Sequence, residues 1–194
     1  MTLLLLLACA PKDADTASDT AAEETTDTTD DATTDGSRVS TTWFIGTGER
    51  SFADASPDVT YELLYQRRLE PGSGQIIEDT YEVIDGALTH QQVTAGVDGD
   101  TFTGAYTDEY GDLTVTGTLV GDPWTWFLWD AEATYTSGER EGATLTANVE
   151  LHSRGLAAEE TLTLSDGAEV HVDLAIADPV DEATFSARLE KLGG

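Results

Sequence analysis

The residues best suited to recognise a ligand stand at every second position of one segment. They are Tyr61, Leu63, Tyr65, Arg67 and Leu69. Side chains two positions apart in a β-strand share one face, so the spacing predicts that Arg67 lies among apolar neighbours. A buried guanidinium requires an anionic partner. Two partners stay open, the carboxylate of a bound ligand or an internal acid such as Asp79. Arg67, Tyr65 and Tyr61 are therefore candidate ligand-binding residues.

A second segment with large apolar side chains covers residues 124–129 and reads WTWFLW. A half-exposed strand would alternate apolar with polar residues, whereas this segment is apolar on both faces. In one interpretation, one face fills the core and the other lies under a C-terminal helix. In the other, Trp124, Trp126 and Leu128 line a hydrophobic ligand pocket together with inward residues of neighbouring strands.

The sequence lacks the patterns typical of catalysis and of metal binding. It contains no serine nucleophile elbow, no cysteine nucleophile motif, no phosphate-binding loop and no zinc-protease helix. The histidines His90, His152 and His171 stand in three separate predicted strands, and no pair has the short spacing of a metal-binding motif. We therefore predict that the protein is not an enzyme and has no metal or cofactor site.

The N-terminal residues Leu6-Leu7-Ala8-Cys9 close a leucine-rich run. They resemble the lipobox of bacterial lipoproteins. In that family a signal peptidase cuts before the cysteine, whose thiol and new amino group are then acylated. The resemblance implies a signal peptide over residues 1–8 and a lipid anchor at Cys9. Because Ala10 is not acidic, it also implies sorting to the outer membrane of the cell envelope, on its periplasmic or surface face.

Residues 9–37 comprise the cysteine and a tail of threonine, alanine and acidic residues. The tail has no aromatic residue and no aliphatic side chain larger than alanine, so it cannot bury enough apolar area to offset the entropy of ordering. It is predicted to be a disordered tether. The whole chain carries 38 acidic and 9 basic residues, a formal net charge of −29. Such a surface repels nucleic acid, which is therefore excluded as a partner.

Residues 38–194 form one predicted domain, in which β-prone runs alternate with glycine, aspartate, proline and serine about every ten residues. The predicted strands lie near residues 40–49, 58–69, 75–84, 87–97, 100–107, 112–121, 124–136, 142–153, 156–165 and 168–177. The last segment, Pro179 to Leu192, is predicted to be a helix, with proline at its start and acidic residues in its first turn.

A meander of about ten antiparallel strands removes its exposed edges most simply by closing into an up-and-down barrel, with the helix packed outside. A β-sandwich is the alternative. The predicted barrel resembles the calycin group of lipocalins and fatty-acid-binding proteins, although Thr41 stands two positions before Trp43, where lipocalins carry glycine. The resemblance implies a ligand inside the barrel and, for Arg67, a ligand carboxylate as the partner.

These observations predict a lipoprotein of the cell envelope, held at the membrane by its lipid anchor, whose barrel binds a small hydrophobic or amphipathic ligand. The alternative belongs to a different class. It is a non-catalytic structural or interaction module whose barrel is filled by its own side chains. We expect a monomer in both cases. An apolar cavity larger than about 300 Å³ would favour the ligand binder.

Overall fold

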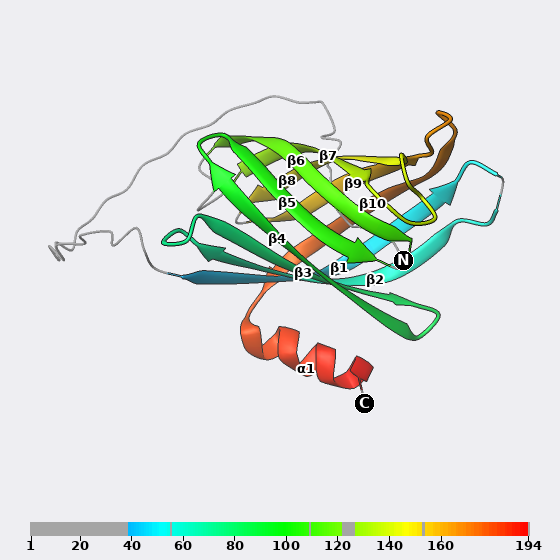
Figure 1. Cartoon of the computed structure of the whole chain (residues 1–194). Helices are drawn as coiled ribbons and strands as arrows, with labels where there is room; N and C mark the ends of the chain where they lie inside the picture. The colour runs from blue at the N-terminus through cyan, green and yellow to red at the C-terminus, as the bar shows by residue number, and fades with distance from the viewer. Residues whose placement is uncertain (1–38, 55, 109, 122–126, 153, 194) are drawn as a thin grey trace, which may run out of the picture.

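Ten antiparallel strands and one C-terminal helix make up the part of the chain that the computed structural model describes (Figure 1). That part is residues 39–193, apart from residues 55, 109, 122–126 and 153. The strands are β1 (Ser40–Phe52), β2 (Val59–Glu70), β3 (Gln75–Ile84), β4 (Ala87–Asp98), β5 (Thr101–Asp108), β6 (Gly111–Gly121), β7 (Phe127–Tyr135), β8 (Thr144–His152), β9 (Gly155–Thr163) and β10 (Glu169–Val180). The helix α1 is Glu182–Gly193. The predicted leader and tether lie outside the described residues.

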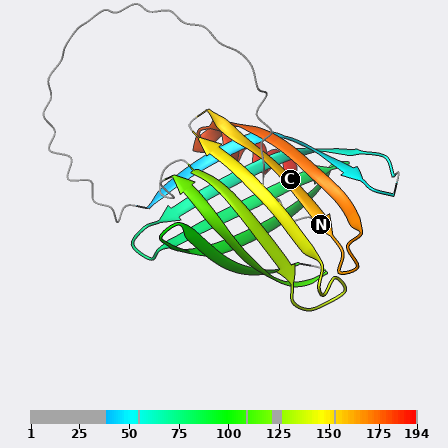
Figure 2. The same cartoon turned by 90° about the horizontal axis from the view of Figure 1, so that it is seen from above.

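The sheet closes into a single barrel, as predicted. Each strand pairs antiparallel with its neighbours in the sequence, and β1 also pairs with β10. Closure gives every strand two partners, so no strand presents an unpaired edge. The alternative of a β-sandwich is therefore wrong. Seen from above, the strands run obliquely around the barrel (Figure 2).

Side chains alternate between the interior and the outer face along the strands. In β9, for example, every second residue from Leu156 to Leu162 is buried and the residues between them are not. On the inner face, Phe102 of β5 stacks on Trp129 of β7 over the intervening strand β6, with 4.3 Å between the ring centroids. Gly117 stands directly opposite Phe102 on the neighbouring strand and leaves the space that this ring fills. The core on this side of the barrel is therefore closely packed.

The C-terminal helix begins later than predicted. Pro179 continues β10, where it pairs with Phe44, and is not the first residue of the helix. Asp181 caps the helix instead, because its carboxylate accepts a hydrogen bond of 2.7 Å from the backbone N–H of Thr184. Within the described residues, α1 is the single helix, and it lacks the length and apolar character needed to cross a membrane.

The helix lies against the outside of the barrel, below β1 to β3 in Figure 1. Phe185 is buried, and its ring meets the edge of Tyr81 on β3 with 6.2 Å between centroids. Arg188 forms an ion pair with Glu62 on β2. This aromatic contact and this ion pair help to attach the helix to the sheet.

We expect Gly117→Ala to lower the free energy of unfolding by about 1–3 kcal/mol, because overpacking a filled core is destabilising. The new Cβ would lie 2.2 Å from the Phe102 ring and 2.4 Å from the carbonyl oxygen of Asp130. The matched control is Gly96→Ala, an exposed position whose Cβ would come no closer than 3.9 Å to the Thr103 carbonyl oxygen. We expect the control to change stability by less than about 0.5 kcal/mol. Urea unfolding measures both, and equal midpoints would contradict close packing at Gly117.

Candidate functional site

Charged side chains gather on one side of the barrel interior. The buried polar residues at inward positions are Arg50, Arg67, Glu78, Thr80, Glu82, Glu160, His171 and Asp173. They belong to β9, β10, β1, β2 and β3, which are consecutive neighbours in the closed sheet. The inward faces of β4 to β8 carry mainly apolar and aromatic residues. The interior therefore has an ionic side and an apolar side.

Arg67 is buried, with 1% of its surface exposed, as the sequence predicts. It stands directly opposite Glu78 in the pairing of β2 with β3. The Tyr65 hydroxyl donates a hydrogen bond of 2.5 Å to Glu78 Oε1. Burial raises the pKa of the Glu78 carboxyl, whereas the Tyr65 hydrogen bond and the charge of Arg67 oppose that rise. Burial lowers the pKa of Arg67, and the charge of Glu78 on the neighbouring strand acts in the opposite direction.

The internal acid beside Arg67 is Glu78 and not Asp79, so the prediction for Asp79 is wrong. Asp79 points to the outer face, where its Oδ1 lies 2.8 Å from Gln92 Nε2 and 2.8 Å from His90 Nε2. The reason is the alternation along β3, in which adjacent residues face opposite sides of the sheet. A shift of one residue exchanges the two faces, and the sequence pattern of β3 leaves that choice open.

Of the remaining predicted ligand-binding residues, the structure describes Tyr61, Tyr65 and Leu128, and Leu128 does not join the two tyrosines. Tyr61 and Tyr65 are buried at inward positions of β2, each with 3% of its surface exposed. Leu128 points away from them to the outer face, and 48% of its surface is exposed. Its neighbour Trp129 is one of the inward residues of β7 and was missed by the prediction. Trp124 and Trp126 lie outside the described residues.

A second ionic cluster is centred on Arg50 of β1. Its Nε lies 2.9 Å from both carboxylate oxygens of Asp173, and its Nη2 lies 3.2 Å from Glu82 Oε2. The guanidinium carbon lies 5.4 Å from the centroid of the Tyr61 ring. That ring approaches the backbone of Gly48, where a Cβ would lie 2.0 Å from it. Glycine at residue 48 is therefore required for Tyr61 to reach the interior.

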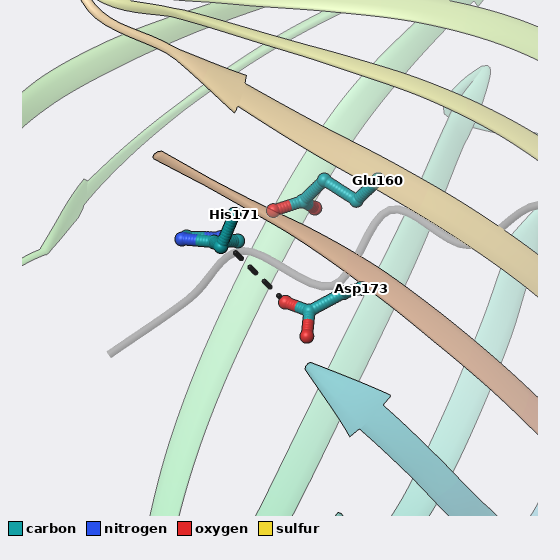
Figure 3. Close-up of side chains that lie close together, drawn as sticks. All are labelled: Glu160, His171 and Asp173. Carbon is teal, nitrogen blue, oxygen red and sulfur yellow. Dashed lines mark ion pairs between the residues drawn. The ribbon is translucent and has the colours of Figure 1, made fainter. Parts of the chain in front are cut away.

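Asp173 also belongs to a group of three side chains that could hold a metal ion, drawn in Figure 3. Glu160 of β9 stands directly opposite Asp173 of β10, and His171 precedes Asp173 by two positions on the same face. One nitrogen or oxygen of each residue lies within 4.8 Å of the others. The exposed fractions are 0% for Glu160, 3% for His171 and 1% for Asp173. This group is the one set of possible metal ligands found among the described residues.

Burial determines the charge of these groups. It lowers the pKa of His171 to about 4, with a further contribution from the positive charge of Arg50, so the imidazole is neutral at pH 7. Burial also raises the pKa of Asp173 to about 7, although the ion pair with Arg50 acts in the opposite direction. The cluster therefore combines a neutral nitrogen donor with the Asp173 carboxyl, whose ionisation burial disfavours.

This cluster was not predicted from the sequence, because the spacing was tested between pairs of histidines and not between a histidine and an acidic residue. His171 and Asp173 form a His-x-Asp pair within one strand, and a spacing of two places both on one face. Glu160 joins them only through the pairing of β9 with β10, which the sequence pattern does not specify.

Two grooves in the described part of the barrel lie on its outer surface. One of about 700 Å³ runs over β1, β2, β9 and β10, with Leu174 and Ile176 exposed along it. Another, of about 510 Å³, runs over β6 to β9 among threonine and acidic side chains. These grooves do not correspond to the apolar pocket predicted for the interior.

We expect Arg67→Met to lower the free energy of unfolding by about 3–5 kcal/mol, because it leaves the Glu78 carboxylate buried without the guanidinium. The double variant Arg67→Met/Glu78→Gln should recover at least half of that loss, since the uncompensated charge is removed with it. Urea unfolding at pH 7 of the single and double variants measures the coupling. Additive losses would contradict the pairing of Arg67 with Glu78.

Comparison with known proteins identifies no relative, so a functional proposal depends on the fold and the buried cluster. No protein-family model matches the chain, and no curated protein matches it either. The resemblance to bacterial lipoproteins rests on residues 6–9, and the resemblance to calycin barrels rests on the arrangement of the predicted strands. Both stay predictions.

Proposed function

We propose that the protein is a lipid-anchored lipoprotein of the cell envelope whose barrel is a non-catalytic interaction module. This is the second of the two functions that the sequence suggests. The observation that favours it over a carrier of hydrophobic ligands is that inward side chains of the described strands are buried and packed against one another. On the apolar side, Phe102 and Trp129 stack across the space beside Gly117.

The ionic side of the interior also argues against a hydrophobic ligand. A ligand carboxylate that bound Arg67 would lie next to the buried carboxylate of Glu78. Two carboxylates beside one guanidinium would leave a surplus negative charge in a medium of low dielectric constant. The ligand would also have to displace or protonate Glu78, which Tyr65 holds by a hydrogen bond.

The outer surface is then the part of the barrel that can meet a partner. Its groove over β1, β2, β9 and β10 is bordered by acidic side chains such as Glu49 and Glu62, and Ile176 there is 67% exposed. With a net charge of −29, the chain favours partners that are basic or neutral at the contact surface.

The proposed anchor is Cys9, and the proposed tether is the acidic tail that follows it. Each buried methylene contributes about 0.8 kcal/mol to membrane binding, so two or three acyl chains hold a protein where one chain is marginal. Like charges along the tail repel one another and favour extended conformations, which would keep the barrel away from the membrane surface.

We expect Cys9→Ser to move the protein from the membrane fraction to the soluble fraction in cells, because the residue that would carry the acyl chains is removed. Fractionation followed by immunoblotting measures the change, and incorporation of a labelled fatty acid should fall to background. Thr16→Ser, in the same tail, is the matched control and should leave both readouts unchanged. Membrane retention of the Cys9→Ser protein would argue against a lipid anchor.

We expect the acylated full chain, extracted from the envelope in mild detergent, to show no further bound organic molecule by native mass spectrometry. Added fatty acid should bind to less than about a tenth of the molecules, because buried aromatic and aliphatic side chains pack together on the apolar side of the described barrel interior. The detergent alone is the control. A defined one-to-one complex with fatty acid would instead favour the ligand-binding function and overturn the proposed one.

A further inference from the structure

We propose that Glu160, His171 and Asp173 bind one divalent transition-metal ion, of the class of Zn²⁺, inside the barrel. This inference goes beyond the proposed function, since it depends on the barrel interior and not on the anchor or on a protein partner. It gives a role to three polar side chains at positions where apolar residues could also fill the barrel.

The first argument is the geometry of the three donors. Zinc binds histidine nitrogen and carboxylate oxygen at about 2.0–2.2 Å, so two ligand atoms on one ion lie at most about 4.4 Å apart. His171 Nε2 and Asp173 Oδ2 are 3.7 Å apart, and the donors of all three residues lie within 4.8 Å of one another. Small side-chain rotations are therefore sufficient to bring all three to one ion.

The second argument is the state of His171. Its side chain is almost wholly buried, yet Nε2 has no hydrogen-bond partner among the described residues. The contact of 3.7 Å with Asp173 Oδ2 is too long for a hydrogen bond. A buried polar atom of this kind is rare in folded proteins and calls for an explanation such as a bound ion. A metal ion between His171 and the carboxylates would satisfy this nitrogen.

The third argument is charge. Arg50 bonds to Asp173 and also to Glu82, so its single positive charge is shared between two buried carboxylates. Unbalanced negative charge inside a protein is strongly unfavourable. A divalent cation at Asp173 would supply the missing positive charge and would leave Arg50 in place to orient the Asp173 carboxylate, as partners of metal ligands commonly do.

The donor set favours one class of metal over another. Calcium and magnesium prefer six or more oxygen ligands, or several bound waters. Imidazole together with carboxylates suits zinc and its neighbours in the first transition row. Three protein donors leave one position of a tetrahedral ion for water or a further ligand. The site would therefore take Zn²⁺ in the presence of excess Mg²⁺.

The test is titration of the full chain with Zn²⁺ by isothermal calorimetry in the presence of excess Mg²⁺, which occupies weak sites made of exposed acids. All proteins carry Cys9→Ser, because the thiol is itself a zinc ligand. We expect one Zn²⁺ per chain and a rise in Tm of about 5–10 °C at a hundredfold excess over Kd.

Two variants assign the site. His171→Phe removes both ring nitrogens and keeps a ring beside Phe52, whose centroid lies 6.0 Å from that of the imidazole. Its matched control is His90→Phe on the outer face, where the ring stacks on Tyr81 at 4.3 Å. Glu160→Gln keeps the size of the side chain and removes the charge. We expect His171→Phe and Glu160→Gln to weaken zinc binding at least tenfold, and His90→Phe to change it by less than twofold.

Each outcome of the titration either supports or overturns the proposed site. No binding to the parent protein, or equal binding to the parent and to either interior variant, would overturn the site. Loss of binding in His90→Phe alone would also overturn it, since the ion would then be bound on the surface. If His171→Phe does not fold, Glu160→Gln decides the question by the same criterion. None of these results depends on lipid anchoring. A failure of the metal-site proposal would therefore not contradict the proposed function, and the reverse is also true.

Discussion

Closure of the sheet is the constraint on which the rest of this structure depends. Once β1 pairs with β10, every strand has two neighbours, and every second residue must face the interior whatever its polarity. On β4 to β8 these positions hold apolar and aromatic side chains that pack together. On β1 to β3, β9 and β10 several of them are charged, and closure leaves those side chains at most 7% exposed.

Register then determines which charges meet. The pairing of β2 with β3 places Arg67 opposite Glu78, and the pairing of β9 with β10 places Glu160 opposite Asp173. The first pair joins opposite charges, whereas the second joins two acids. β1 is the second neighbour of β10, and Arg50 on β1 forms two contacts of 2.9 Å with the carboxylate of Asp173. The acid on β3 thus faces a basic residue across the strand pair, whereas the acid on β9 faces another acid.

Much of this fold follows from the sequence pattern, because alternation and turn residues are local signals. The ten strands, the barrel and the buried position of Arg67 are all confirmed. What the pattern does not specify is which of two adjacent residues faces inward in an apolar or mixed strand. The prediction that Leu128, and not Trp129, faces the interior is an error of that kind. The cluster of Glu160 with His171 depends on the register between β9 and β10, which is not a local signal. Pro179 was misplaced because proline is favoured both at a helix start and where a strand ends.

The ionic side of the interior is difficult to explain by stability alone. Well-packed apolar residues of similar volume usually stabilise a core as well as a buried ion pair does, or better. Arg67 at least stands opposite an acid, Glu78, whose carboxyl accepts a hydrogen bond from Tyr65. Beside His171 the arrangement lacks that compensation, since an uncharged nitrogen with no hydrogen-bond partner among the described residues faces a carboxylate 3.7 Å away. An apolar residue at 171 would remove the cost of burying that nitrogen, so the polar residue is best explained by a cation that the three side chains hold together.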